Sequence, residues 1–285
     1  MDYNNILSKN NQNLDFIAEV ESKNYQNSFP YPHIVLSNFF DEFFLNKVFE
    51  EFPDLSKIDS SKKYMNKNEI KFANNKYDCF PNSIKRLIEF LNSDYYLKFL
   101  QKITSIKEKL IIDPELNGGG LHEIKKGGIL KIHTDFNKHP KLNLDRRLNV
   151  LLYLNKDWNM EYGGDLELWD KDLKNCKKKI SPSFNKMVIF STNDYSYHGH
   201  PDPVNCPEHM SRKSLALYYF SKGRPSTDID SIKVKNKTYF EDRFGFKNET
   251  NNDTKSFKNY FRRFKFYKIM KSIEKKYLRK KNKFE

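Results

Sequence analysis

One pair of residues in this sequence has the types and the spacing of metal ligands. His133 and Asp135 flank Thr134 in the segment ILKIHTDF, whose length and β-branched content predict a strand. Because side chains two residues apart point to the same side of a strand, one imidazole and one carboxylate can reach a single ion. A histidine from another strand would complete a two-histidine, one-carboxylate set, which leaves positions open on Fe(II) for oxygen chemistry.

This spacing alone is a weak indication, because the sequence contains a second pair of the same kind. His200 and Asp202 flank Pro201. Proline is poorly tolerated inside a hydrogen-bonded strand, so we expect the second pair to lie in a turn and not to serve as the rigid metal platform. The surrounding segments must therefore identify the site.

The segments after about Asn117 predict the β-rich body that would position these ligands. Short apolar runs alternate there with glycine-rich turns, among them LNVLLYLN, GDLELWD, KMVIF and KSLALYYF. Such segments predict an antiparallel barrel or a double-sheet jelly roll. The 24 Phe and 17 Tyr residues favour an interior of packed aromatic rings.

Hydrophobic spacing predicts helices on the N-terminal side of this body. Residues 33–36 predict a short strand, and apolar residues recur at helical spacing over 43–52. The same spacing over 84–103 predicts one or two helices packed on the body, whereas residues 1–27 form a leading helix or a loose arm. The expected fold class is α+β with a mainly β core, a double-stranded β-helix (jelly roll) flanked by N-terminal helices.

The basic character of the chain is concentrated at its C-terminus. The net charge is +14, but residues 254–285 hold thirteen Lys and Arg against two Glu, or +11, which leaves +3 for the rest. Apolar residues at spacings of three and four predict a basic amphipathic helix there. Such a helix could contact a polyanion, either a nucleic acid or a membrane surface, but we favour a helix that buttresses the body. Residues 226–253 predict a loop with one strand, VKNKTYF.

Cysteine usage and hydropathy suggest the compartment. The three cysteines are too few and too scattered for a disulfide framework. The sequence shows no apolar run long enough for a transmembrane segment or a secretion signal. We expect a soluble, cytoplasmic protein.

The order of motifs from about Gly118 to Pro225 resembles the prolyl 4-hydroxylase-like branch of the 2-oxoglutarate/Fe(II) dioxygenases. The shared features, in order, are the HTD triplet, the YLNKDW segment, the Gly163–Gly164 pair, a histidine shortly before Pro203-Val204, and an arginine that opens an aromatic-ended strand. The resemblance implies that His133, Asp135 and His198 bind iron. His200 remains the alternative third ligand.

The resemblance also implies a reaction. Enzymes of this family use 2-oxoglutarate and O₂ as co-substrates, release succinate and CO₂, and hydroxylate an unactivated C–H bond, with ascorbate as a candidate reductant. Arg212 would pair with the distal carboxylate of 2-oxoglutarate through two parallel hydrogen bonds, with Lys213 as the fallback. Tyr153 would share that carboxylate or be an ordinary core residue. The substrate could be a peptidyl proline or a small metabolite, and no residue here identifies it.

Three parts follow from these patterns: an N-terminal arm (1–27), a dioxygenase domain (28–225, with its motif-bearing core at 118–225), and a C-terminal extension with the basic helix (226–285). Two other functions remain open. One is a cupin-like metalloenzyme that uses the same three residues without 2-oxoglutarate. The other is a non-catalytic module that binds polyanions through its tail.

Other polar and aromatic residues near the motifs receive a structural interpretation. We expect His122 to cap a strand rather than approach the site. We expect His139 and His209 to be solvated, and Trp158 and Trp169 to pack beside the sheet. Arg146 and Arg147 either orient the loop 136–145 or are solvated.

Overall fold

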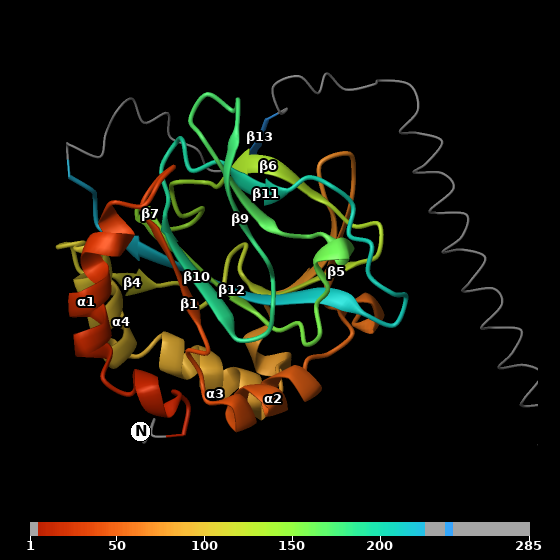
Figure 1. Ribbon diagram of the computed structural model, residues 1–285, viewed down its shortest axis with the longest axis horizontal. Coiled ribbons are helices and arrows are strands. Elements are labelled where there is room, and N and C mark those ends of the chain that lie inside the picture. The colour runs from red at the N-terminus through yellow and green to blue at the C-terminus, as the bar shows by residue number, and fades with distance from the viewer. Residues whose placement is uncertain (1–4, 226–236, 242–285) are drawn as a thin grey trace, which may run out of the picture. The chain divides into compact units, whose positions relative to one another are not determined.

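The structure, a computed structural model, describes residues 5–225 and 237–241, which form two antiparallel sheets and a layer of helices (Figure 1). The strands of the larger sheet are β1 (His33–Ser37), β2 (Lys62–Met65), β3 (Ile70–Asn74), β4 (Ile111–Ile112), β5 (Gly120–Lys125), β7 (Asp145–Tyr153), β10 (Lys186–Ser191) and β12 (Ser211–Ser221). They pair in the order β1-β10-β7-β12-β5-β3-β2, with β4 also on β12.

The smaller sheet carries the pair from which the sequence argument began. Its strands are β6 (Leu130–Thr134), β8 (Leu166–Trp169), β9 (Cys176–Ile180), β11 (His198–His200) and β13 (Tyr239–Phe240). They pair in the order β13-β6-β11-β8-β9. Strands far apart in sequence, β6 and β11, are therefore direct neighbours.

Helices cover the larger sheet on the side away from the smaller one (Figure 1). They are α1 (Leu14–Gln26), α2 (Glu42–Glu50), α3 (Asn82–Leu91) and α4 (Asp94–Thr104), with short 3₁₀ turns at Lys9–Asn11, Leu55–Lys57, Tyr77–Cys79 and Met160–Tyr162. Side-chain caps begin three of them: Asn13 accepts from the amide of Phe16 at 3.0 Å, Asp41 from that of Phe44 at 2.9 Å, and Ser93 from that of Tyr96 at 3.3 Å. No helix in the described ranges is long and apolar enough to cross a membrane.

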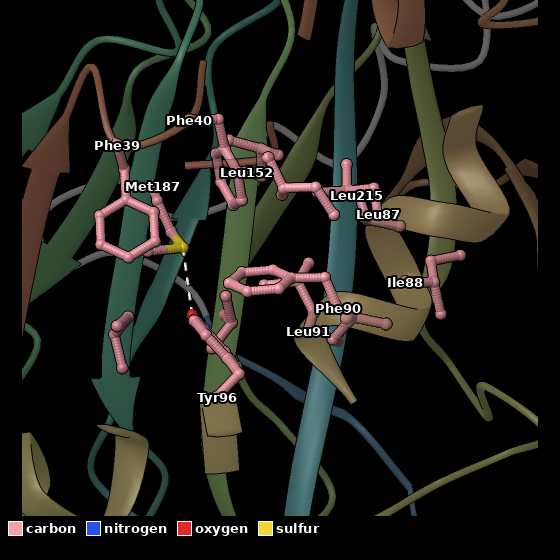
Figure 2. Close-up of a cluster of buried hydrophobic side chains, with 14 of the residues drawn as sticks. Phe39, Phe40, Leu87, Ile88, Phe90, Leu91, Tyr96, Leu152, Met187 and Leu215 are labelled. Carbon is pink, nitrogen blue, oxygen red and sulfur yellow. Dashed lines mark hydrogen bonds between the residues drawn. The ribbon is translucent and has the colours of Figure 1, made fainter. Parts of the chain in front are cut away.

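Alternation from Leu148 to Tyr153 along β7 separates the core from the functional face. Leu148, Val150 and Leu152 are buried in the cluster that joins the sheet to the helices. Figure 2 shows this cluster, in which Leu152 lies near aromatic rings from α3 and α4, and the Tyr96 hydroxyl donates to the Met187 sulfur at 3.2 Å. The residues between them point to the opposite side and line the pocket, and a register shift before Leu148 turns Arg146 to that side as well.

The two sheets pack face to face through a second buried cluster. Leu166 and Leu168 of β8 lie in it together with Val188 and Phe190 of β10. The residues beside this cluster line a pocket between the sheets. A β-rich core flanked by N-terminal helices confirms the predicted fold class.

The structure also sharpens the predicted element boundaries. Residues 14–26 of the expected arm form α1, which buries Leu14, Ala18 and Tyr25 in the helix-side core. Strand β6 ends at Thr134, so Asp135 lies immediately after the strand on which it was predicted. The predicted tail helix at 254–285 lies outside the described residues.

Candidate metal centre

Three side chains from the smaller sheet converge on one point. His133 on β6 and His198 on β11 are directly paired in the strand register, and Asp135 follows β6. One ligand atom from each lies within 4.8 Å of the others. The Nε2 atoms of His133 and His198 lie 3.7 and 3.4 Å from the carboxylate oxygens of Asp135. Within the described part of the chain, no other group of three such residues could hold a metal ion.

Main-chain hydrogen bonds orient both imidazoles. The Nδ1 atom of His133 lies 2.8 Å from the carbonyl oxygen of Lys131, and that of His198 lies 2.8 Å from the carbonyl oxygen of Ser196. Because a carbonyl only accepts, each Nδ1 carries the proton and each Nε2 presents a lone pair to the centre. Burial, together with nearby His198, lowers the pKa of His133 to about 3, so this ring is neutral at physiological pH, as metal binding requires.

The carboxylate of Asp135 is held by Arg146 and Asn149 of β7. Its Oδ2 accepts from Arg146 Nη2 at 3.0 Å and from Asn149 Nδ2 at 2.7 Å. The fully buried guanidinium lies against two rings, 4.5 Å from the ring centroid of Phe136 and 3.4 Å from that of Tyr218. Burial raises the pKa of Asp135, but Arg146 and His198 outweigh it and hold this pKa well below its usual range.

These residues fit a divalent first-row metal such as Fe(II). Two imidazole Nε2 atoms and the carboxylate of Asp135 converge on one point. The carbonyl oxygens of Lys131 and Ser196 fix the direction of the two rings, and Arg146 fixes that of the carboxylate. The set of two histidines and one carboxylate is typical of non-haem Fe(II) oxygenases, because it leaves coordination positions for other ligands.

A cation and a hydroxyl on the larger sheet line the same pocket. Arg212 of β12 donates from Nη2 to the hydroxyl of Tyr153 at 3.3 Å and from Nε to the carbonyl of Gly164 at 2.7 Å. Both side chains are buried, and burial raises the pKa of Tyr153, which keeps its hydroxyl protonated. Lys213 faces the other side, with its ammonium 5.1 Å from the ring centroid of Phe49. The arrangement can bind an anion opposite the metal ligands.

The pocket between the sheets has a volume of about 150 Å³. Besides the groups above, its lining includes His122 of β5 and His200 of β11, which lie deep in the fold, and Tyr64, Glu69 and Lys71 of the β2–β3 region. The ammonium of Lys71 lies 3.0 Å from the carboxylate of Glu69. Strand β13 also contributes, since the Phe240 ring centroid lies 5.3 Å from that of His133.

Residues 119–220 match the family model of the 2OG-Fe(II) oxygenase superfamily. The matched segment contains the three metal ligands and Arg212. A segment of 88 residues is 34% identical to prolyl 3-hydroxylase OGFOD1 of Mus musculus, covering 29% of this chain and 16% of that relative. The match thus spans about one sixth of the relative's length.

Two solved structures share the fold of this chain. One is a prolyl hydroxylase of Trichoplax adhaerens in complex with a peptide fragment of the hypoxia inducible factor, with a TM-score of 0.54, 17% identity, and 74% and 92% of the two chains covered. The other is a prolyl-4-hydroxylase of Pseudomonas putida, with a TM-score of 0.52, 11% identity, and 73% and 100% covered. The resemblance inferred from the sequence is confirmed at the level of the family and fold.

The structure corrects several expectations about polar residues near the motifs. His122 lines the pocket instead of merely capping a strand. His139 is buried rather than solvated. Its Nδ1 accepts hydrogen bonds from the amides of Lys141 and Leu142 at 3.1 and 3.0 Å. Arg147 is also buried, and its Nη1 lies 2.8 Å from a carboxylate oxygen of Glu108.

Other expectations agree with the structure. His209 is exposed, and Trp158 and Trp169 are buried. The sequence argument did not connect Arg146 with Asp135, which is eleven positions away and follows a strand of the other sheet. One signal in the sequence was available: Arg146 stands near the start of a strand of apolar residues, and a charged side chain buried there needs a partner of opposite charge.

Proposed function

We propose that this protein is a non-haem iron(II)- and 2-oxoglutarate-dependent dioxygenase that hydroxylates an unactivated C–H bond and releases succinate and CO₂. The observation that carries the proposal is one buried pocket with a metal-ligand set at one end and an anion-binding pair, Arg212 and Tyr153, at the other. A metalloenzyme that does not use 2-oxoglutarate would leave this buried cation without a partner charge.

Each side chain has a role in this proposal. His133, Asp135 and His198 hold the metal, and bound Fe(II) supplies the oxygen activation that protein side chains lack. Arg212 and Tyr153 bind the distal carboxylate of 2-oxoglutarate through charge-assisted hydrogen bonds. Burial of the pocket limits the access of water to the reacting groups. Ascorbate would act as a reductant that maintains Fe(II).

The substrate class is proposed from the relatives. All three relatives described above are prolyl hydroxylases, and the Trichoplax adhaerens structure carries a peptide. A prolyl residue in a peptide is therefore our first candidate, and a small metabolite is the second. Tyr64, Glu69 and Lys71, which lie outside the family match, would meet either one at the pocket.

A binding experiment separates this proposal from its metalloenzyme rival. Anaerobic addition of Fe(II) and then 2-oxoglutarate should produce a visible charge-transfer band, which His133→Ala and Asp135→Ala abolish. Arg212→Ala should keep metal binding but require more 2-oxoglutarate, whereas His209→Ala, at an exposed position, should match the unchanged protein. Absence of the band in the unchanged protein would refute the proposal.

Substrate identity needs a separate screen. Succinate release should be measured with proline-containing peptides, free amino acids and sugar-linked metabolites, followed by mass spectrometry for one added oxygen. Stimulation by a peptide would support the first candidate. Stimulation by a metabolite alone would replace it with the second.

A polyanion-binding module remains a weaker alternative, because it rests on residues 254–285, outside the described ranges. Its test is the salt dependence of binding to DNA or to anionic vesicles. Binding that persists after deletion of 254–285 would exclude the tail as its cause.

A further inference from the structure

His200 is a buried pocket residue that the proposed metal site does not use. It lies at the end of β11, two residues after His198, and only 3% of it is exposed. The pairing of β11 with β6 shifts between these two histidines, so that His198 lies opposite His133 while His200 lies opposite Leu130. The irregular register separates His200 from the group of metal ligands, yet it still lines the pocket.

Both ring nitrogens of His200 are buried and lack a hydrogen-bond partner among the described residues. The main chain of Asp202 lies close to the ring, but not in the geometry of a hydrogen bond to either nitrogen. The two metal-site histidines differ, since each has its Nδ1 bonded to a carbonyl oxygen. Buried polar atoms are rarely left unpaired in proteins, so this ring indicates a missing ligand atom.

The charges around His200 indicate what that ligand is. His200 lines the same pocket as the guanidinium of Arg212 and the ammonium of Lys71. An imidazole carries at least one N–H donor in either of its protonation states. A donor in a pocket that also contains a buried arginine suits a carboxylate, which accepts several hydrogen bonds at once.

We propose that His200 donates a hydrogen bond to the same distal carboxylate of 2-oxoglutarate that Arg212 and Tyr153 bind. This inference rests on the proposed function. It assigns three side chains from β7, β11 and β12 to one carboxylate, so that both sheets hold the co-substrate. His200 would then be a binding residue for the co-substrate and not a metal ligand.

The test compares variants by direct binding. His200→Leu and His200→Phe remove both nitrogens, whereas His200→Asn keeps an N–H donor. Anaerobic titration of the Fe(II)-loaded protein, followed by the charge-transfer absorbance, should show 2-oxoglutarate binding about 10- to 100-fold weaker in the Leu and Phe variants. The Asn variant should recover part of that loss, and His209→Leu should show none.

A second ligand locates the contact. The five-carbon acid 2-oxovalerate lacks the distal carboxylate, so its affinity should be the same in the unchanged protein and in His200→Leu. An equal loss of affinity for both acids would overturn the assignment, and so would unchanged 2-oxoglutarate binding in the Leu and Phe variants.

Metal binding is measured separately with Mn(II) by electron paramagnetic resonance. Unchanged Mn(II) affinity in His200→Leu supports the proposal, whereas loss of Mn(II) binding would make His200 a metal ligand and overturn it. If the unchanged protein itself gives no band with 2-oxoglutarate, the proposed function fails instead. The two failures are therefore distinguishable.

Discussion

At the scale of single residues, Arg146 controls the charge and direction of Asp135. Its guanidinium is fully buried and contacts the carboxylate at 3.0 Å. We expect Arg146→Met to weaken Mn(II) binding about 10- to 100-fold, because partners behind a metal ligand fix its orientation and ionisation. It should also lower the free energy of unfolding by about 3 kcal/mol, since a buried carboxylate loses its cation. Calorimetric titration and urea unfolding measure the two effects.

Arg147 provides the matched control for this prediction. It is also buried and follows directly in sequence, but it pairs with Glu108 rather than with Asp135. Arg147→Met should therefore lower stability while leaving the Mn(II) affinity unchanged. Equal losses of metal affinity in the two variants would mean that Arg146 acts through general destabilisation.

Gly164 allows a prediction about the co-substrate arginine. Its φ is +74°, and a Cβ placed there would lie 3.0 Å from the Cδ of Arg212. We expect Gly164→Ala to displace the guanidinium of Arg212, which donates to the Gly164 carbonyl. The displacement should weaken 2-oxoglutarate binding about tenfold, because the co-substrate would lose about one charge-assisted hydrogen bond. Titration of the charge-transfer band measures this change.

Gly163 separates backbone strain from the contact with Arg212. It also has a positive φ, +63°, but a Cβ there would meet only the carbonyl oxygen of Pro203, at 4.0 Å. Gly163→Ala should therefore cost stability through strain without changing 2-oxoglutarate affinity. If both variants weaken binding equally, distortion of the turn would be the cause rather than the contact.

At the scale of elements, β13 brings a residue from beyond the family match to the metal site. Phe240 lies opposite His133 in the pairing of β13 with β6, and the Glu241 amide donates to the Ile132 carbonyl at 3.0 Å. We expect Phe240→Ala to speed the release of bound Mn(II) to a chelator, because the apolar surroundings of a metal site limit access to it. Stopped-flow mixing with the chelator measures the rate.

Tyr239 is the neighbouring control on the same strand, with 55% of it exposed. Tyr239→Ala should leave the release rate unchanged, because its side chain does not line the pocket. A similar increase in both variants would show that the pairing of β13, rather than the Phe240 ring, protects the metal.

The elements also show how far the sequence predicted the site. Tyr153 and Arg212 came from the family resemblance alone, and the structure brings them together from the long, buried strands β7 and β12. Strand β9 was missed because its lysines face solvent and conceal the pattern. Arg146 was misjudged because its burial depends on Asp135, which follows a strand of the other sheet, and local composition does not record such a long-range contact.

At the scale of the whole molecule, the pocket draws on more of the chain than the family domain. The metal ligands and Arg212 lie within residues 119–220, whereas Tyr64, Lys71 and Phe240 lie outside them. The proposed metal and co-substrate residues therefore lie within the family match, whereas part of the remaining pocket wall comes from segments outside it. This division explains why the reaction class could be inferred while the substrate could not.

Folding of the whole molecule also depends on keeping pocket histidines neutral. Burial lowers the pKa of His122 to about 3, whereas in the unfolded chain it ionises near its ordinary value of 6.5. Between these values the unfolded state binds one more proton, so stability falls as the pH falls, by up to about 1.4 kcal/mol per pH unit from this ring. His133 and His200 shift in the same direction and add to the effect.

We expect His122→Gln to reduce the slope of the free energy of unfolding against pH by up to the contribution of one proton, since glutamine does not titrate. Urea unfolding of the metal-free protein at pH 7, 6 and 5 measures the slope. His209→Gln, at an exposed position, should leave it unchanged. An unchanged slope in His122→Gln would mean that this ring is hydrated well enough to ionise in the folded protein, and that His133 and His200 alone link stability to pH.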